Sequence, residues 1–146
     1  MARIFTLHEA EAMLPDLERW LRAAIESRKD VSTIEDQLKA LLLRINMLGG
    51  MQVDVRQVVE LKTGREQHVE HLKRAVAEIE SSGALLKDLD MGLIDFPTLL
   101  DGEEVYLCWK LGEPSIGFWH HTSEGYSGRK QIDRDFLDRH KGNRPM

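Results

Sequence analysis

Residues 14–48 read LPDLERWLRAAIESRKDVSTIEDQLKALLLRINML, and this stretch decides the architecture of the first half of the chain. Mostly apolar side chains recur in it at alternating spacings of three and four residues, the period of one face of an α-helix. The series comprises Leu14, Leu17, Leu21, Ala24, Arg28, Val31, Glu35, Leu38, Leu42 and Ile45. Because only Arg28 and Glu35 in it are charged, it predicts one long amphipathic helix with a heptad seam.

The signals around this helix predict where it begins and ends. Thr6 and Glu9 have the spacing of a capping box, so a helix is expected to begin near Leu7. Pro15 then either kinks that helix or lies in the first turn of a second, longer one. Leu48-Gly49-Gly50 predicts a reversal of the chain.

A second helical series follows the reversal. It comprises Val55, Val58, Lys62, Arg65, Val69, Leu72, Val76 and Ile79. Gly64 interrupts it and weakens the helix by about 1 kcal/mol. Antiparallel pairing of the two series places Ile45 beside Val55 and Glu35 beside Arg65, so one seam charge meets an opposite charge. The same register predicts no opposite charge of the second series beside Arg28, which is therefore expected to mark either a solvated gap or a contact with another chain.

The chain changes character near residue 82, because the second half carries most of the glycines and aromatics and all but one of the prolines. Residues 85–89, 93–100, 104–111 and 116–121 read as short strands joined by tight turns. They predict an antiparallel meander. A tight turn at Asp101-Gly102 gives it one apolar face by pairing Thr98 with Val105, Phe96 with Leu107, and Ile94 with Trp109.

The predicted fold class is therefore α+β, a long antiparallel helical hairpin packed with a small antiparallel β-meander. We expect one domain over residues 1–146. Within it the hairpin takes residues 1–82, the sheet 83–132, and a short helix with a frayed tail 133–146.

The opposite face of the sheet carries the candidate chemistry. The same register aligns Asp88, Asp95 and Cys108, with Tyr106 and Lys110 beside them and either Trp119 or His121 next. Carboxylates, a thiol and an imidazole can bind a transition metal or form an acid–base pair, and they can equally be ordinary polar residues around a buried thiol. His120 joins the apolar face if the last turn has an even length, and an odd turn or a bulge reverses this.

Two further motifs permit alternative interpretations. His68 and His71 lie three residues apart on a helix, where they can chelate, although their charged surroundings favour a solvated helix face. The loop from Gly125 to Arg129 can bind an anion through backbone N–H groups and a guanidinium, or it can be a structural turn.

Composition narrows the class of protein. The formal net charge of -5 argues against a nucleic-acid partner. Cys108 is the single cysteine, which excludes an intramolecular disulfide and suggests a reducing compartment, the cytoplasm. No apolar run approaches the ~20 residues that span a bilayer, so no membrane insertion is expected.

The second half is similar to a known bacterial family. The motifs are KDLDMGLIDFP at residues 87–97, VYLCW at 105–109, Trp119-His120 and the Gly125–Arg129 loop, with Phe5-Thr6-Leu7 at the start. They resemble the bacterial family catalogued as domain of unknown function 2203. The resemblance implies a small cytoplasmic protein with a helical front, a compact β segment and no transferable activity. It emphasises Asp90, Asp95, Cys108, Glu113, His120 and Arg129, rather than Asp88 and His121.

Two functional hypotheses follow. The first is a binding or interaction module that forms a homodimer along its exposed helix seam, because no complete catalytic signature is present. The second is a metal-dependent, hydrolytic site with a divalent transition metal on Asp95, Cys108 and His120 and with Glu113 as the base. Arg129 is the candidate residue for binding an anion. Whether the protein is an enzyme is left open.

Overall fold

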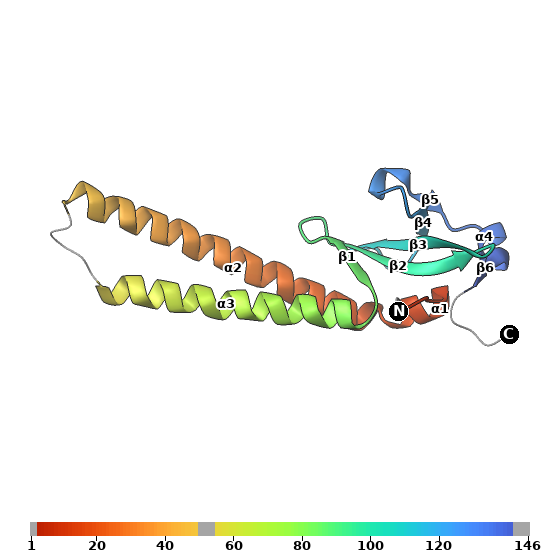
Figure 1. Cartoon of the computed structure of the whole chain (residues 1–146), viewed down its shortest axis with the longest axis horizontal. Coiled ribbons are helices and arrows are strands. Elements are labelled where there is room, and N and C mark those ends of the chain that lie inside the picture. The colour runs from red at the N-terminus through yellow and green to blue at the C-terminus, as the bar shows by residue number, and fades with distance from the viewer. Residues whose placement is uncertain (1–2, 50–54, 142–146) are drawn as a thin grey trace. The chain divides into compact units, whose positions relative to one another are not determined.

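The computed structural model describes residues 3–49 and 55–141, which fold into helices followed by an antiparallel sheet (Figure 1). Its elements, in order, are α1 (Leu7–Ala12), α2 (Leu14–Met47), α3 (Val55–Ser81), β1 (Leu85–Asp88), β2 (Leu93–Leu100), β3 (Glu103–Lys110), β4 (Phe118–His121), the 3₁₀ turn η1 (Tyr126–Gly128), β5 (Lys130–Gln131), α4 (Arg134–Arg139) and β6 (His140–Lys141). The predicted α+β class is confirmed.

The chain divides into two compact units, which we name by their main element. The sheet unit comprises Met1–Leu21 and Val76–Met146, and the hairpin unit comprises Arg22–Ala75. Both long helices run through the boundary, so each unit contains part of α2 and part of α3.

The start of the chain follows the predicted capping signals. Thr6 Oγ1 accepts a hydrogen bond from the backbone N–H of Glu9, and Glu9 Oε1 accepts one from the N–H of Thr6. Helix α1 therefore begins at Leu7 and ends at Ala12. Pro15 lies in the first turn of α2, where its missing N–H has no helical partner to lose. The second of the two interpretations of Pro15 is thus confirmed.

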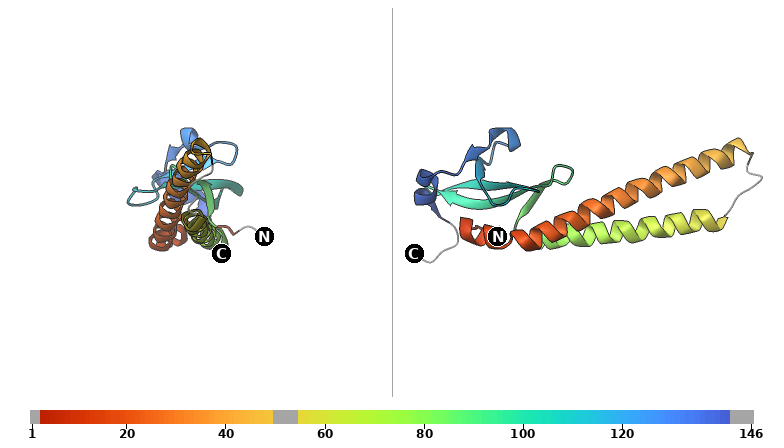
Figure 2. Two further views of the ribbon diagram at one scale, coloured as in Figure 1. Left: turned by 90° about the vertical axis from the view of Figure 1, so that its left-hand side faces the viewer. Right: turned by 180° about the vertical axis from the view of Figure 1, so that it is seen from behind.

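In the hairpin unit α2 and α3 run antiparallel and side by side, as all three ribbon views show (Figures 1 and 2). The predicted pairing of Glu35 with Arg65 is present, with 3.2 Å between Oε1 and Nε. Gly49 has a φ of 65°, as expected for a residue that ends a helix in the left-handed region. Gly50, the other glycine of the predicted reversal, lies outside the described residues.

The buried seam of α2 differs in phase from the predicted one. The buried and half-buried side chains that continue the three-four spacing are Ala24, Ser27, Val31, Ile34, Leu38, Leu41 and Ile45. Ala24, Val31, Leu38 and Ile45 agree with the prediction, but Arg28, Glu35 and Leu42 are exposed, so their assignment to the seam was wrong. A small rotation about the helix axis keeps both charges in water, which avoids the cost of desolvating them.

The same rotation occurs in α3. Leu61 is half-buried and Lys62 is exposed, which reverses the prediction for Lys62. Arg65 is also exposed, so its ion pair with Glu35 bridges the two helices at the flank of the seam and not inside it. Exposed pairs of this kind contribute at most about 1 kcal/mol.

The sheet is an antiparallel meander in the order β1-β2-β3-β4-β5, and β6 pairs with β2 as a sixth strand. The three predicted pairs of the central hairpin, 98 with 105, 96 with 107 and 94 with 109, are all confirmed. The apolar face that they form is buried, and Phe5 packs edge-on against Phe96 with 5.4 Å between ring centroids. The backbone N–H of Phe5 also donates to the carbonyl of Pro97 at 2.7 Å, which joins the start of the chain to β2.

The C-terminal segment contains the predicted short helix, α4. Asp133 caps it by accepting a hydrogen bond from the N–H of Phe136 at 2.8 Å, and the Phe136 ring is buried. The frayed tail was predicted for residues that include 142–146, which lie outside the described part of the chain. Among the described helices, none combines the length and the apolar character that a bilayer span requires.

Candidate metal centre

The turn between β2 and β3 fixes which residues meet on the polar face of the sheet. Asp101 and Gly102 both have positive φ, 53° and 82°, the conformation of a type I′ hairpin turn. Such a two-residue loop pairs Leu100 directly with Glu103. Counting back along both strands, Asp95 stands opposite Cys108 and shares its face.

The connection between β3 and β4 brings His120 to the same face. Tyr106 pairs with His120 and Cys108 pairs with Phe118, so His120 is the diagonal neighbour of Cys108. The alternative in which an even turn sends His120 to the apolar face is therefore wrong. Adjacent strands β2, β3 and β4 thus each contribute one side chain to a single cluster.

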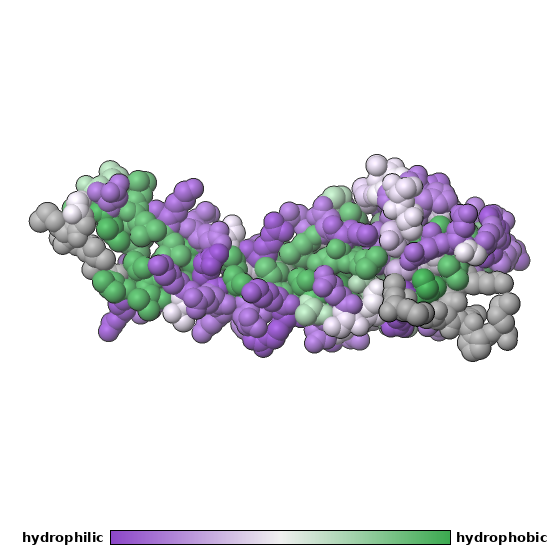
Figure 3. Space-filling view, viewed as in Figure 1, coloured by the Kyte–Doolittle hydropathy of each residue, from purple (hydrophilic) through white to green (hydrophobic). Residues whose placement is uncertain are grey.

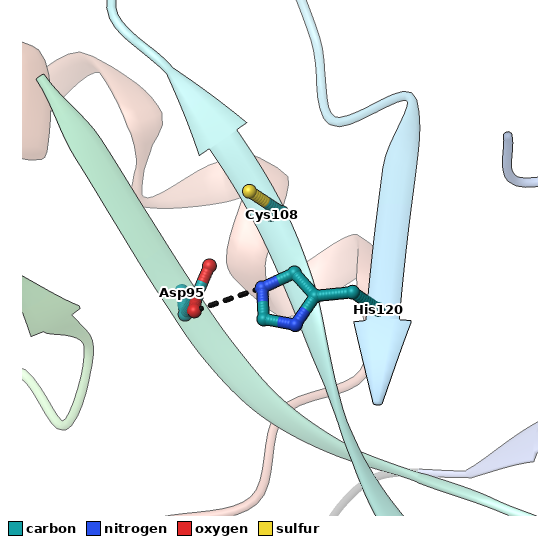
Figure 4. A group of neighbouring side chains, drawn as sticks. All are labelled: Asp95, Cys108 and His120. Atoms are coloured by element: carbon teal, nitrogen blue, oxygen red, sulfur yellow. Dashed lines mark hydrogen bonds and ion pairs between the residues drawn. The ribbon is translucent and has the colours of Figure 1, made fainter. Parts of the chain in front are cut away.

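This cluster, Asp95, Cys108 and His120, is compact and buried (Figure 4). One potential ligand atom from each residue lies within 4.8 Å of the other two. Asp95 Oδ2 and His120 Nε2 are 3.0 Å apart. The exposed fractions of the three residues are 2%, 1% and 2%, in the order Asp95, Cys108 and His120.

The hydrogen bond that His120 makes through Nδ1 determines which partners its Nε2 can have. Nδ1 lies 2.8 Å from the carbonyl oxygen of His121, and because a carbonyl only accepts, Nδ1 carries a proton. Nε2 and Asp95 Oδ2 must then share either one further proton or a cation, since two lone pairs cannot form a hydrogen bond. A histidine that donates Nδ1–H to a carbonyl and directs Nε2 inward is oriented as metal-ligating histidines are.

The other carboxylate oxygen of Asp95 supplies a separate indication of a missing partner. Asp95 Oδ1 is buried and has no hydrogen-bond partner among the described residues. An unsatisfied buried carboxylate oxygen costs at least about 1–3 kcal/mol. A cation bound between the three side chains would remove that cost.

The thiol of Cys108 is protonated and shielded as the site stands. Burial, followed by the neighbouring charge of Asp95, raises the pKa of Cys108 to about 12. Asp95, and not Cys108, is the partner of His120 Nε2. The cluster therefore lacks the thiolate–imidazolium pair of a cysteine nucleophile, which needs an accessible thiol with a lowered pKa.

Aromatic and cationic side chains contact the cluster residues. The Tyr106 ring packs edge-on against His120 with 5.6 Å between centroids. Lys87 Nζ lies 4.7 Å from the centre of the Tyr106 ring. Arg129 Nη2 donates to the carbonyl of Cys108 at 3.3 Å. These contacts close the site around its three side chains.

Three of the other candidates lie elsewhere. Asp88 was predicted to align with Asp95, which is wrong, because Leu85 occupies that position and an irregularity in β1 pairs Asp88 with Leu93. Its Oδ1 accepts a hydrogen bond from the N–H of Met91 and so caps the following turn. Asp90 is exposed in that turn, and His121 is exposed on β4.

Glu113 and Arg129 form a second feature, an ion pair beside the cluster. Arg129 Nη2 lies 2.7 Å and 2.9 Å from the two carboxylate oxygens of Glu113. Only 9% of the Arg129 side chain is exposed, and its guanidinium carbon lies 4.0 Å from the centre of the Phe118 ring. Glu113 Oε1 also accepts a hydrogen bond from the N–H of Lys110. Roles as base for Glu113 and as anion ligand for Arg129 stay predictions, and each charge already has an opposite charge beside it.

His68 and His71 lie on α3 and belong to no group of three candidate ligands among the described residues. His68 Nδ1 lies 3.5 Å from Asp30 Oδ2 at a partly exposed position, and the two imidazole rings meet edge-on. Their surroundings are those of a solvated helix face.

Comparison with known proteins agrees with the family resemblance. The family model described as "Uncharacterized conserved protein (DUF2203)" matches residues 3–132. The chain belongs to this family. No curated protein and no solved structure matches it. Since the family description names no activity, the chemistry of the site has to be argued from its own side chains.

The pairing of Glu113 with Arg129 is a contact of this family member that the sequence did not predict. The two residues are 16 positions apart in the sequence, with β4 between them, so their spacing does not predict a contact. The available signal was that these opposite charges lie on the two sides of β4 in the sequence, and β4 pairs with β3 at Cys108. The family resemblance had marked both residues without indicating that they touch.

Proposed function

We propose that this chain is a metal-binding protein whose sheet holds one divalent transition-metal ion, Zn²⁺ being the best match, through Asp95, Cys108 and His120. The observation that supports it is the meeting of three different ligand types, from three adjacent strands, within 4.8 Å in a buried place. Buried polar groups are otherwise expected to have partners, and Asp95 Oδ1 has none among the described residues.

The donor set favours zinc over the hard cations. Thiolate is a soft ligand and imidazole a borderline one, whereas Mg²⁺ and Ca²⁺ bind almost entirely through oxygen. Asp95 Oδ1, which has no hydrogen-bond partner among the described residues, can join Oδ2 in binding the ion as a bidentate carboxylate. Binding would displace the thiol proton of Cys108 and the proton shared by Asp95 and His120.

The spacing is compatible with an ion after a small side-chain adjustment. Metal bonds of about 2.0–2.3 Å in a tetrahedron hold the ligand atoms about 3.3–3.5 Å apart. The distance of 3.0 Å between Asp95 Oδ2 and His120 Nε2 has to lengthen slightly, and any separation near the 4.8 Å limit has to shorten. Rotation of the Cys108 side chain about its Cα–Cβ bond can move the sulfur inward.

The proposed ion has a structural role. All three residues are at most 2% exposed, so a substrate has no route to a metal held by them without movement of the sheet. An ion bound by the folded chain contributes folding free energy, because the unfolded chain holds no such site. The ion would cross-link β2, β3 and β4.

The test uses the untagged full chain, so that no affinity tag brings its own histidines. We expect elemental analysis to find close to one zinc per chain after purification in zinc-containing medium. Removing the metal with a chelator should lower the midpoint of thermal unfolding, and Zn²⁺ at 100 times its Kd should restore about 2.7 kcal/mol of stability. Loading with Co²⁺ should produce a thiolate charge-transfer band in the near ultraviolet.

Matched variants separate the site from non-specific binding. Asp95→Asn, Cys108→Ser and His120→Ala should each lose zinc and the cobalt band. Asp88→Asn and His121→Ala change neighbouring residues outside the cluster and should keep both. The proposal would be overturned if the purified chain contains no metal and added Zn²⁺ does not stabilise it. Asp95 and His120 would then be a buried hydrogen-bonded pair.

We also propose a cytoplasmic location, which the presence of a single, buried cysteine supports. A lone buried thiol that serves as a ligand has to remain reduced, as thiols do in the cytoplasm. Fractionation of cells that produce the untagged chain should recover it, with its thiol reduced, in the cytoplasmic fraction. Recovery in an oxidising compartment would contradict this location.

A further inference from the structure

The free end of the helical hairpin exposes a group of large apolar side chains, which we name the apolar end. Its members are Leu42, Leu43, Met47, Leu48, Val55 and Val59, each at least 50% exposed. Figure 3 shows apolar surface at this end of the hairpin, at the left of the view. Contiguous apolar surface beyond about 300–600 Å² is uncommon on a monomer and marks an interaction site.

The charges of the hairpin are unevenly distributed along its length. The segments that carry the apolar end are residues 38–48 and 55–62, and from here the name includes all of these residues. They have one acid, Glu60, and four basic side chains, Lys39, Arg44, Arg56 and Lys62. The next segment inward, residues 29–37 and 63–71, is the acidic middle. It has five acids, Asp30, Glu35, Asp36, Glu66 and Glu70, against the bases Lys29 and Arg65. A basic stretch thus directly adjoins an acidic one.

We propose that two copies of this chain associate antiparallel through their hairpins, the apolar end of each lying on the acidic middle of the other. A two-fold axis then makes both contacts equivalent, and each brings opposite charges together. The four helices form an antiparallel bundle over the shared length. This interaction surface lies in the hairpin unit and does not depend on the proposed metal site.

The area of the apolar end favours overlap over contact between the ends alone. A stable interface buries about 800 Å² on each partner. Each partner of such an interface contributes roughly 20–30 residues, and the apolar end has six large exposed apolar side chains, so the contact has to extend along the hairpin, where the neighbouring surface is the acidic middle. Within the hairpin unit Ala24, Leu41 and Ala75 are the buried apolar side chains among the described residues, so the bundle also supplies a core that one hairpin lacks.

An anionic membrane is the other surface that an apolar and basic end could contact. Helices that lie in the membrane interface insert Trp, Phe or Leu, and the described apolar end offers leucines but neither Trp nor Phe. The acidic middle lies directly beside it and would be repelled by anionic lipid. The same acidic stretch attracts the basic end of a second copy, so the second copy is the occupant that the charges favour.

Sedimentation velocity of the full chain tests the proposal over a range of concentrations and salt. We expect a monomer–dimer equilibrium whose Kd rises with ionic strength. Replacing Arg44→Glu together with Arg56→Glu should weaken the dimer at least tenfold. Adding Asp36→Arg and Glu70→Arg to that variant should restore it, because the charges of both contacting surfaces are then reversed.

Controls exclude a mere effect of net charge or of unfolding. Lys73→Glu with Arg74→Glu makes the same charge change on α3 outside both surfaces and should leave Kd within twofold. Leu43→Gln with Met47→Gln should abolish dimerisation while circular dichroism retains the helical content. Chelator-treated protein should dimerise unchanged, which separates this surface from the metal site.

Three results would overturn the proposal. One is a monomer at all concentrations up to about 1 mM. Another is a failure of the reversed charges in the four-residue variant to restore association. The third is binding of the hairpin to vesicles of phosphatidylserine and phosphatidylcholine that is lost in the Leu43→Gln, Met47→Gln variant while the chain stays monomeric.

Discussion

The sheet unit and the hairpin unit bury their side chains in different ways. The largest fully buried side chains all belong to the sheet unit, among them Trp109, Phe5 and Phe96. In the described hairpin unit the buried side chains are small or few: Ala24, Ser27, Leu41 and Ala75. The hairpin nevertheless contains most of the residues of both long helices.

The difference follows from geometry. A sheet with one apolar face excludes water from a whole surface, whereas two helices in contact exclude it only along one stripe. Free energy from apolar burial is therefore concentrated in the sheet unit, which also holds the candidate metal centre. The hairpin unit depends more on helix propensity and on whatever covers its outer faces.

The largest expected contrast comes from one substitution made in both units. Leu107→Ala in β3 removes a side chain that is fully buried, and we expect it to lower the free energy of unfolding by about 2–5 kcal/mol. Leu43→Ala in α2 removes one that is 59% exposed and should change it by less than about 1 kcal/mol. Urea denaturation at a concentration where the chain is monomeric measures both.

Comparable losses from the two leucines would contradict this contrast. They would mean that Leu43 is covered in the free chain. The two-state assumption can be checked in the same experiment by comparing helix and tryptophan signals, since Trp20, Trp109 and Trp119 all belong to the sheet unit.

The next effect concerns the buried pair within the sheet unit. In chelated, metal-free protein, His120→Leu leaves the Asp95 carboxyl group without its partner and should cost about 3–5 kcal/mol. Asp95→Leu combined with His120→Leu removes both polar groups and should cost clearly less than the single change. Thermal and urea unfolding of the two variants measure the difference.

His121→Leu is the matched control, since it changes an exposed imidazole one residue away and should cost less than about 0.5 kcal/mol. A double variant at least as unstable as His120→Leu would show that shape, and not the unpaired charge, dominates at this position.

The sequence predicted the sheet better than the phase of the helices. Strand register was predictable because a two-residue turn at Asp101-Gly102 allows only one pairing of β2 with β3. A shift of that register by one residue would move every side chain to the opposite face, so the apolar pattern also excludes it. In a helix adjacent residues differ by only 100°, so a series containing Arg28 and Glu35 scores almost as well as the observed series containing Ser27 and Ile34. The free-energy cost of desolvating a charge decides between the two series, and the spacing of apolar residues gives no information about that cost.

The site was predictable in part for a related reason. The pairing of Asp95 with Cys108 followed from the turn, but the place of His120 depended on the irregular connection from Leu111 to Gly117, whose path strand parity does not predict. Asp88 was misplaced because a local irregularity in β1 shifts its register. Irregular backbone is where simple alternation rules stop applying.

A smaller effect within the sheet unit depends on pH. Burial and the charge of Asp95 raise the pKa of Cys108 from 9.0 to about 12. The folded chain thus holds the thiol proton more tightly than the unfolded chain. The resulting stability is fully present below pH 9 and is lost as pH rises from about 9 to about 12, with a slope of about 1.4 kcal/mol per pH unit.

Other groups also titrate at high pH, so the contribution of Cys108 has to be measured by comparing the original chain with the Cys108→Ala variant, both without metal. The difference in unfolding free energy between the original chain and the variant should be constant below pH 9 and should shrink above it. Parallel stability curves up to about pH 11 would mean that the thiol is more accessible to water than its 1% exposure indicates.

The smallest expected effect on stability comes from replacing one glycine in each unit by alanine. Gly64 lies within α3, and an added Cβ there would meet Ile34 Cδ1 at 3.5 Å, an ordinary van der Waals contact. Gly64→Ala should therefore stabilise the hairpin by about 0.5–1 kcal/mol through helix propensity. Gly92→Ala in the sheet unit should destabilise, because Gly92 has a φ of +71° and an added Cβ would lie 2.7 Å from Leu111 Cβ. Urea denaturation measures both variants. If Gly64→Ala is destabilising as well, the two helices leave less room at Gly64 than the 3.5 Å distance to Ile34 indicates. The two units would then differ less in packing than in burial.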